Sequence, residues 1–319
     1  MKITHTIFGI MLATATAGAW AQNYPNKSVR VLVGFSAGGA TDNVARFIAP
    51  SLGEGLGQNL LVENRAGASS IIAGELVAKA APDGYTLFMV TQTLINAMIL
   101  NEKTFPDLAK DFAAVSLVAT TPLVLVVNPS LPVKSVSQLI ALAKARPNQI
   151  NYGSGGIGAS PHMSGELLAK MAGIKIIHVP YKGEAPALVD LLGGHLPVMF
   201  SNLTAAIPMV QAGKLRAIGV TSKEPAPAVP GVPPVAETLP GFEVLGWFGL
   251  VAPLATPRDV IARVNSEVNK ALARADVKEK FAAQGLTPSG DTPEHYGAFI
   301  KSESAKWGKL IKDAGISIK

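Results

Sequence analysis

The chain has 319 residues, a formal net charge of +6 at pH 7 and no cysteine. The absence of cysteine excludes disulfides, thiol nucleophiles and cysteine-ligated metal sites. The positive charge is mild and spread out, without a block of five like charges, so the composition does not indicate a nucleic-acid-binding protein. A chain of this length can form one large domain or two of medium size around its own core.

Residues 1–21 have the pattern of a secretory signal peptide. Lys2 precedes an apolar stretch around Ile7 to Ala15, and Ala19-Trp20-Ala21 fits the small-x-small cleavage rule. The apolar core is too short to span a bilayer, and no later segment reaches the roughly 18 uninterrupted apolar residues of a membrane helix. We expect export and a mature chain that begins at Gln22.

The first predicted strand runs into a glycine turn. Residues 29–35 read as a strand, and the apolar spacing over residues 44–52 predicts a helix. Between them, Gly38 and Gly39 lack a Cβ, so their backbone can approach a ligand closely and adopt positive φ. The free N–H groups at the helix start favour an anion in the turn. We expect Asp42 to brace the first helical turn rather than to contact a ligand.

Strands and helices then alternate. Strands are predicted over residues 59–65 and 85–90, with a helix over residues 71–77 between them. This alternation indicates a parallel sheet with helices on both faces, and ligands bind such sheets at the carboxyl ends of the strands. Phe35, Thr91 and the glycine turn all fall at that edge.

A second glycine turn follows in the middle of the chain. Residues 114–127 contain two strand-like runs, Ser135 begins a capping box, and the strand 150–152 leads into the turn Ser154 to Ala159. Ser160 and Pro161 are predicted as N-cap and first residue of the next helix. Further strands are predicted over residues 175–179, 196–200 and 215–220, the second of which stops at Ser201-Asn202.

The last third returns to the first domain. Residues 224–241 contain six prolines and are predicted as an extended connector. A strand is predicted over residues 242–251, and two helices close the chain, capped by Thr256 and Thr292. Two chain crossings, near residues 122 and 246, divide the mature chain into a discontinuous first lobe, 22–122 with 247–319, and a second lobe, 123–246.

Other functions were weighed on the same residues. Residues 153–158 match G-x-G-x-x-G, but the next strand lacks the acidic residue that a dinucleotide site needs, so no cofactor is expected. The histidines fall on separate elements, and no metal site is expected. An exported α/β hydrolase or transferase that uses Ser154 or Ser160 with His162 stays open. Both glycine turns can also be no more than tight connections.

An ordered set of motifs resembles the Bug (TctC-like) family of periplasmic solute-binding receptors. The motifs cover the mature chain in this order: Phe35-x-Ala37-Gly38-Gly39-Ala40-Thr41-Asp42, Val62-Glu63-Asn64-Arg65-x-Gly67-Ala68, Ala81-Pro82-Asp83-Gly84-Tyr85, Tyr152-Gly153-Ser154-Gly155-Gly156-Ile157-Gly158, Val179-Pro180-Tyr181-Lys182-Gly183 and Met199-Phe200-x-Asn202. The resemblance implies a type II periplasmic-binding-protein fold: two α/β lobes, each a mostly parallel sheet flanked by helices, joined by a hinge. It also implies a periplasmic receptor, not an enzyme, that delivers a small carboxylate to the membrane subunits of a tripartite tricarboxylate transporter. A receptor that signals to a sensor kinase is left open.

The resemblance also implies the site. In the family, a carboxylate is held by backbone N–H groups and ordered waters of the two glycine turns. Many members have Asp where this chain has Ser201, which disfavours an amine ligand here and favours dicarboxylates or aromatic acids. The expected ligand-binding residues are Phe35, Ala37, Gly38, Gly39, Ala40, Thr41, Thr91, Ser154, Gly155, Gly156, Gly158, Ala159, His162, Tyr181, Ser201 and Asn202.

Overall fold

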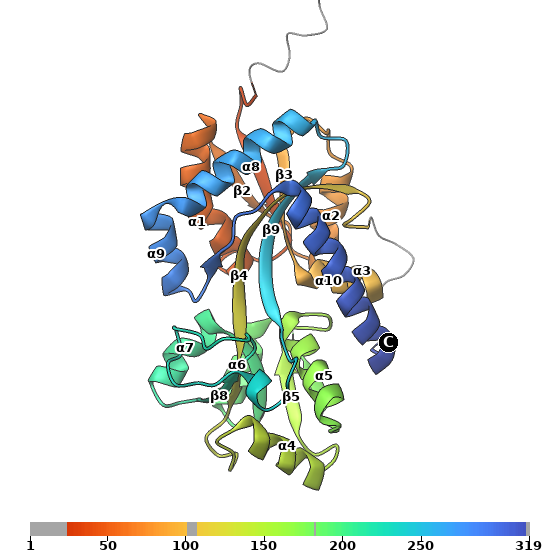
Figure 1. Cartoon of the computed structure of the whole chain (residues 1–319), viewed down its shortest axis with the longest axis vertical. Helices are drawn as coiled ribbons and strands as arrows, with labels where there is room; N and C mark the ends of the chain where they lie inside the picture. The colour runs from red at the N-terminus through yellow and green to blue at the C-terminus, as the bar shows by residue number, and fades with distance from the viewer. Residues whose placement is uncertain (1–23, 101–106, 182, 317–319) are drawn as a thin grey trace, which may run out of the picture.

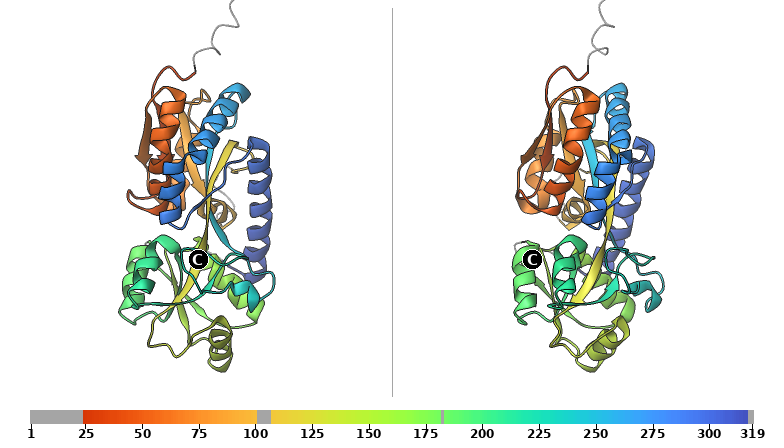
Figure 2. Two further views of the ribbon diagram at one scale, coloured as in Figure 1. Left: turned by 60° about the vertical axis from the view of Figure 1, so that its left-hand side comes forward. Right: turned by 90° about the vertical axis from the view of Figure 1, so that its left-hand side faces the viewer.

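The computed structural model describes residues 24–100, 107–181 and 183–316. The predicted signal peptide therefore lies outside the described residues. The chain forms two lobes, one above the other in Figure 1, that are linked by two long strands. Each lobe is a mixed sheet with helices on both of its faces (Figure 2).

The first lobe is built on three parallel strands at one end of its sheet. These are β1 (Val29–Val33), β2 (Leu60–Asn64) and β3 (Thr86–Thr91), in the order β2-β1-β3. β9 (Leu245–Pro253) pairs antiparallel with β3, and β4 (Phe112–Val127) pairs antiparallel with β9. β3 is buried along its whole length, as expected for a strand covered on both faces.

The second lobe repeats this plan. Three parallel strands lie in the order β7-β5-β6: β5 (Asn151–Ser154), β6 (Ile177–Pro180) and β7 (Val198–Asn202). The end of β4 pairs antiparallel with β7 and with β8 (Arg216–Val220). β4 thus belongs to both lobes: Pro122 still pairs with Leu245 of β9, and the next residue, Leu123, pairs with Asn202 of β7.

Helices cover both faces of each sheet. The first lobe has α1 (Ala40–Leu56), α8 (Arg258–Ala273) and α9 (Ala275–Ala283) on one face, and α2 (Ile71–Ala78), α3 (Gln92–Leu100) and the start of α10 (Pro293–Ala314) on the other. The second lobe has α4 (Val136–Ala145) and α5 (Ser160–Ala172) on one face, and α6 (Glu184–Leu192) and α7 (Leu203–Gln211) on the other. Short elements are η2 (Ala68–Ser70), η3 (Val235–Glu237) and β10 (Thr287–Pro288).

Several local predictions need correction. α3, α7 and α9 were not predicted, because each follows the preceding element without a turn signal. The helix predicted from Thr256 is α8, whose N-cap is Pro257, and the Thr256 hydroxyl does not cap it. Ser160 is the first residue of α5 and Ala159 is its N-cap. The caps at Ser135 and Thr292 are confirmed, since their hydroxyls accept from the N–H groups of Gln138 and His295.

The last helix contacts both lobes. Tyr296 and Ile300, near its start, pack in the core of the first lobe, whereas Trp307, Leu310 and Ile311 pack in the core of the second. Figure 1 shows α10 running beside β9 from the upper lobe to α5 of the lower one. A salt bridge of 2.6 Å between Lys170 of α5 and Asp313 of α10 lies at this end. The fold therefore has three connections between the lobes: β4, β9 and α10.

Candidate functional site

The first glycine turn is braced by Asp42. Its carboxylate accepts hydrogen bonds from the Gly38 N–H at 2.9 Å, from Arg46 Nε at 2.9 Å and from Asn64 Nδ2 at 2.9 Å. Burial works to raise the Asp42 pKa, but these hydrogen bonds outweigh it, so the pKa lies below its ordinary value. The structural role expected for Asp42 is confirmed. Because the Gly38 N–H is engaged, the donors that remain at the start of α1 are the first-turn amides, beginning with Ala40 and Thr41.

The second glycine turn is held by two histidines. Gly158 N–H donates to Nδ1 of His162 over 3.0 Å, and the Ser154 hydroxyl lies 2.7 Å from Nε2 of His178. The two imidazole rings stack with centroids 3.9 Å apart. Burial lowers the pKa of His162 to about 3, with a further contribution from His178, and lowers the pKa of His178 to about 4. Both rings are therefore neutral at neutral pH.

This geometry argues against the hydrolase alternative. The Ser154 hydroxyl donates its proton to the Gly156 carbonyl and accepts from Gly156 N–H, so His178 Nε2 must be the donor to it. An imidazole that donates to a serine cannot act as its general base. The Ser160 hydroxyl donates to Gln92 Oε1 rather than to His162. Neither serine is paired with His162.

The second turn docks onto α3 of the first lobe. Asn96 Nδ2 donates to the Gly158 carbonyl over 2.7 Å, and Ser160 donates to Gln92 over 3.0 Å. Gln92 and Asn96 are fully buried at this seam. No helix was predicted directly after Thr91, and neither of these side chains was among the predicted site residues. The position of these polar residues soon after the end of a predicted strand was the signal in the sequence that could have identified them.

A small pocket lies between the two lobes. Ala40, Asn43 and Phe47 of α1 line it from the first lobe, and Asn202 and Thr204 at the start of α7 line it from the second. The helix N-termini of α1 and α7 thus meet in one pocket. Its volume is about 10 Å³, room for roughly one water molecule, so the lobes must separate before an organic molecule can enter.

A carboxylate that sequence reasoning missed lies next to this pocket. Glu184, the first residue of α6, accepts from the Ser201 hydroxyl at 2.7 Å and from the Asn202 N–H at 2.8 Å, and its second oxygen accepts from Asn202 Nδ2. Ser201 is fully buried. An acidic residue directly after the turn at the end of β6 was the signal for it. The sequence analysis took the surroundings of Ser201 to be uncharged, but the structure places the Glu184 carboxylate against its hydroxyl.

The other predicted residues take several positions. Ala37, Gly38 and Gly39 are exposed at the turn, and Phe35 packs on the edge of the first-lobe core. The Tyr181 hydroxyl donates to Asp190 of α6 over 2.7 Å, which fixes its ring on the second lobe. Thr91 is buried at the carboxyl end of β3, and its hydroxyl has no hydrogen-bond partner. Of the predicted set, Ala40 and Asn202 line the pocket between the lobes.

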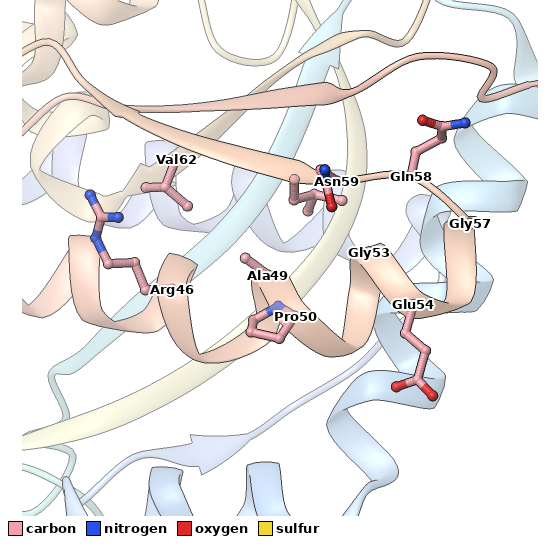
Figure 3. Close-up of a pocket in the computed structure, with 10 residues that line it drawn as sticks. Arg46, Ala49, Pro50, Gly53, Glu54, Gly57, Gln58, Asn59 and Val62 are labelled. Carbon is pink, nitrogen blue, oxygen red and sulfur yellow. The ribbon is translucent and has the colours of Figure 1, made fainter.

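A larger cavity lies elsewhere in the described part of the chain. It is an open groove of about 610 Å³ between α1 and β2, lined by Arg46, Pro50, Gln58 and Val62 among others (Figure 3). None of the predicted site residues lines it. Its cation, Arg46, is already engaged by Asp42 and Asn64. We therefore do not place the ligand there.

The described residues contain neither a candidate metal site nor a candidate membrane-spanning helix. Across residues 24–100, 107–181 and 183–316, no cluster of three or more His, Cys, Asp or Glu side chains could hold a metal ion. In the same part of the chain, no helix is both long and apolar enough to cross a membrane.

Comparisons with known proteins agree with the fold. Residues 44–316 match the model of the tripartite tricarboxylate transporter family receptor. Protein BugT of Bordetella pertussis is 37% identical over 318 residues, which cover 98% of each chain. The structure of Rpa4515 of R. palustris with adipate is 37% identical, with a TM-score of 0.84 over 92% of this chain and 99% of that one. The periplasmic binding protein BugD is 32% identical, with a TM-score of 0.82 over 92% of this chain and 99% of that one.

These matches cover nearly the whole chain in both sequence and structure. They confirm the two-lobed α/β fold and the resemblance drawn from the motifs, and the members of this family are solute-binding receptors rather than enzymes. The chain belongs to the tripartite tricarboxylate transporter receptor family, the Bug or TctC-like periplasmic solute-binding proteins.

Proposed function

We propose that this receptor captures a small organic carboxylate between its lobes and delivers it to the membrane subunits of a tripartite tricarboxylate transporter. The observation that carries the proposal is the pocket in which the N-termini of α1 and α7 face each other from different lobes. A helix N-terminus offers unpaired N–H groups and partial positive charge, which suit a carboxylate. At α1 the amides of Ala40 and Thr41 remain for a ligand, whereas at α7 the Asn202 N–H already donates to Glu184. A ligand held by both lobes also gains affinity from their closure.

Two further points support this assignment. The family description names a tricarboxylate transporter receptor, and the similar protein Rpa4515 is described with adipate. We propose that the residues expected from the sequence at the two glycine turns supply the main-chain donors, with Ala40 and Thr41 at the α1 end. We also propose that residues 1–21 direct export to the periplasm and are cleaved. A sensor kinase is a second candidate partner.

Ala40→Asp tests the position of the carboxylate. A negative charge at the first residue of α1 is favourable for the helix but repels an anion in the pocket. We expect unchanged or higher thermal stability and at least a tenfold loss of affinity, about 1.4 kcal/mol, for acids that bind the wild type. Isothermal titration calorimetry with a panel of small mono- and dicarboxylates measures this.

Ala275→Asp is the matched control. Ala275 is the exposed first residue of α9, so the same charge is added at the same helical position outside the pocket. We expect its affinities to equal those of the wild type. Unchanged affinity in Ala40→Asp would place the ligand elsewhere. Gly39→Val gives a second check of the site. The fold can accept this side chain, because Gly39 has a φ of −77° and an added Cβ meets only the Ser36 carbonyl, at 3.4 Å.

A further inference from the structure

The N-terminus of α7 already holds a carboxylate of the protein itself. One oxygen of Glu184 accepts from the Ser201 hydroxyl and from the Asn202 main-chain N–H, at 2.7 and 2.8 Å. The other oxygen accepts from the Asn202 side-chain amide. Asn202 is the N-cap of α7 and lines the pocket between the lobes. Glu184 thus uses the donors that would otherwise suit an arriving carboxylate.

The charge of Glu184 is not cancelled by these bonds. All three donors are uncharged, and the carboxylate is only partly buried. At the other end of the pocket, Asp42 is 2% exposed and its carboxylate is bound by the Arg46 guanidinium, which compensates its charge. Within residues 24–100, 107–181 and 183–316, the contacts of Glu184 include no cation. In this part of the chain the pocket therefore differs at its two ends: the α1 end offers free donors, whereas the α7 end presents negative charge.

This asymmetry constrains the ligand. A dicarboxylate that spans the pocket would bring its second carboxylate toward Glu184, which is partly buried. The repulsion between these two like charges disfavours binding. A monocarboxylate with its acid group at α1 and an uncharged or hydrogen-bond-donating far end avoids this cost. A carboxylate has room for about four hydrogen bonds, and Glu184 makes three, so one more donor can be accepted.

We propose that Glu184 is a specificity-determining residue that excludes a second ligand carboxylate, so that this receptor selects monocarboxylates. The inference rests on the proposed function and narrows it. It differs from the expectation that Ser201 leaves the far end neutral and permits dicarboxylates. The side chain at position 201 is neutral, but the charge is supplied by Glu184 from the neighbouring helix.

Matched ligand pairs test the proposal. Hexanoate and adipate have the same carbon chain and differ by one carboxylate. Benzoate and terephthalate share a benzene ring and also differ by one carboxylate. For the wild type, we expect the monocarboxylate of at least one pair to bind at least tenfold more tightly than its dicarboxylate by calorimetry. Glu184→Gln keeps the shape and removes the charge, so it should gain at least tenfold in affinity for the dicarboxylate relative to its partner.

Two further variants decide the interpretation. Glu237→Gln removes an exposed charge from the same lobe, and it should leave the ratio unchanged. Glu184→Ala, with its thermal stability measured, covers the case in which the glutamine variant misfolds. A wild type that prefers the dicarboxylate, or a ratio that is equal in the wild type and both Glu184 variants, overturns the inference while Ala40→Asp still tests the proposed function. Binding of neither acid in either pair overturns both.

Discussion

The hydrogen bonds by which the two stacked histidines of the second lobe hold the glycine turn depend on their protonation. His162 accepts from Gly158 N–H through Nδ1, and His178 donates to Ser154 through Nε2. Protonation of His162 would remove the acceptor, and protonation of both histidines would place two positive rings at 3.9 Å. Glu166, whose Oε1 lies 3.7 Å from His162 Nε2 and accepts from Tyr152 OH, is the charged group facing the pair. The conformation of the glycine turn therefore depends on neutral imidazoles.

This gives a prediction for stability against pH. The folded-state pKa values of about 3 and about 4 lie below the ordinary value of about 6.5 for an unfolded chain. The unfolded state thus binds protons first, so stability is complete above pH 6.5 and is lost as the pH falls from there toward 4. Each histidine contributes a slope of up to about 1.4 kcal/mol per pH unit. Urea unfolding followed by circular dichroism at several pH values measures the slope.

His178→Gln separates this contribution from other groups. Glutamine retains a donor for Ser154 but does not titrate, so the slope between pH 6.5 and 4.5 should decrease. His295→Gln is the control, because that histidine is exposed and lies on α10, where its side chain is 82% accessible. A free energy of unfolding that is constant over this range in the wild type would show that the two imidazoles are not buried in solution.

At the scale of elements, the turn that joins β2 to α2 is strained. Three consecutive residues, Ala68, Ser69 and Ser70, have φ values of 45°, 54° and 77°. The left-handed region costs roughly 1–2 kcal/mol per residue for side chains with a Cβ. Ser70 packs directly against Gly34, where any Cβ would lie 1.7 Å from the Ser70 hydroxyl oxygen. The close contact between this turn and the end of β1 is what requires glycine at position 34.

Ala68→Gly should stabilise the protein. Glycine adopts positive φ without the Cβ penalty, so we expect the free energy of unfolding to rise by about 0.5–1 kcal/mol after the entropy of the unfolded glycine is subtracted. Ala78→Gly, at the end of α2, is a matched control of opposite sign, with an expected loss of up to about 1 kcal/mol. Chemical denaturation of both variants measures the difference. A loss of stability in Ala68→Gly would show that the turn does not keep this conformation.

The seam between α3 and the second glycine turn gives the next prediction. Asn96→Ala removes the hydrogen bond to the Gly158 carbonyl, which exists only when the lobes are together. A buried bond of this kind contributes about 0.5–1.5 kcal/mol, so ligand affinity should fall about 2- to 12-fold through weaker closure. Thr93→Ala on the same helix is the control. Calorimetry that finds equal affinities for the wild type and both variants would show that the seam opens and closes without cost.

The sequence predicted elements best where periodicity and turn residues agreed. The strands β1 to β9 and the helices α1, α5 and α8 follow apolar spacing and glycine or proline boundaries, and they were located. The two-residue strand β10 was not predicted. α3, α7 and α9 begin directly after a preceding element, so no turn separated them. The role of Asp42 followed from its position in the first turn, but Glu184 did not, because its contact with Ser201 crosses from α6 to β7. Side-chain contacts between different elements, even consecutive ones such as α6 and β7, depend on how the elements pack.

At the scale of the whole molecule, the lobes are joined by elements of different character. β4 and β9 pair side by side up to Pro122 and Leu245, and then diverge within the second lobe. α10 places Trp307 in the core of the second lobe and Tyr296 in that of the first. The indoles of Trp247 in β9 and Trp307 in α10 both donate to Glu303. We propose the lobe division 22–122 with 247–319 and 123–246, with α10 as a helix that both lobes share.

These connections lead to the last prediction, that ligand binding closes the lobes. The pocket of about 10 Å³ admits no organic acid, so the ligand-free receptor must populate a more open form. The bonds Asn96–Gly158 and Thr204–Gln284 cross from one lobe to the other, so we expect them to break when the lobes separate. Small-angle scattering should give a smaller radius of gyration at saturating ligand than without it. Asn96→Ala should lie closer to the open curve at the same subsaturating ligand concentration. Identical curves with and without ligand would mean that the lobes do not move and that the ligand enters by another route.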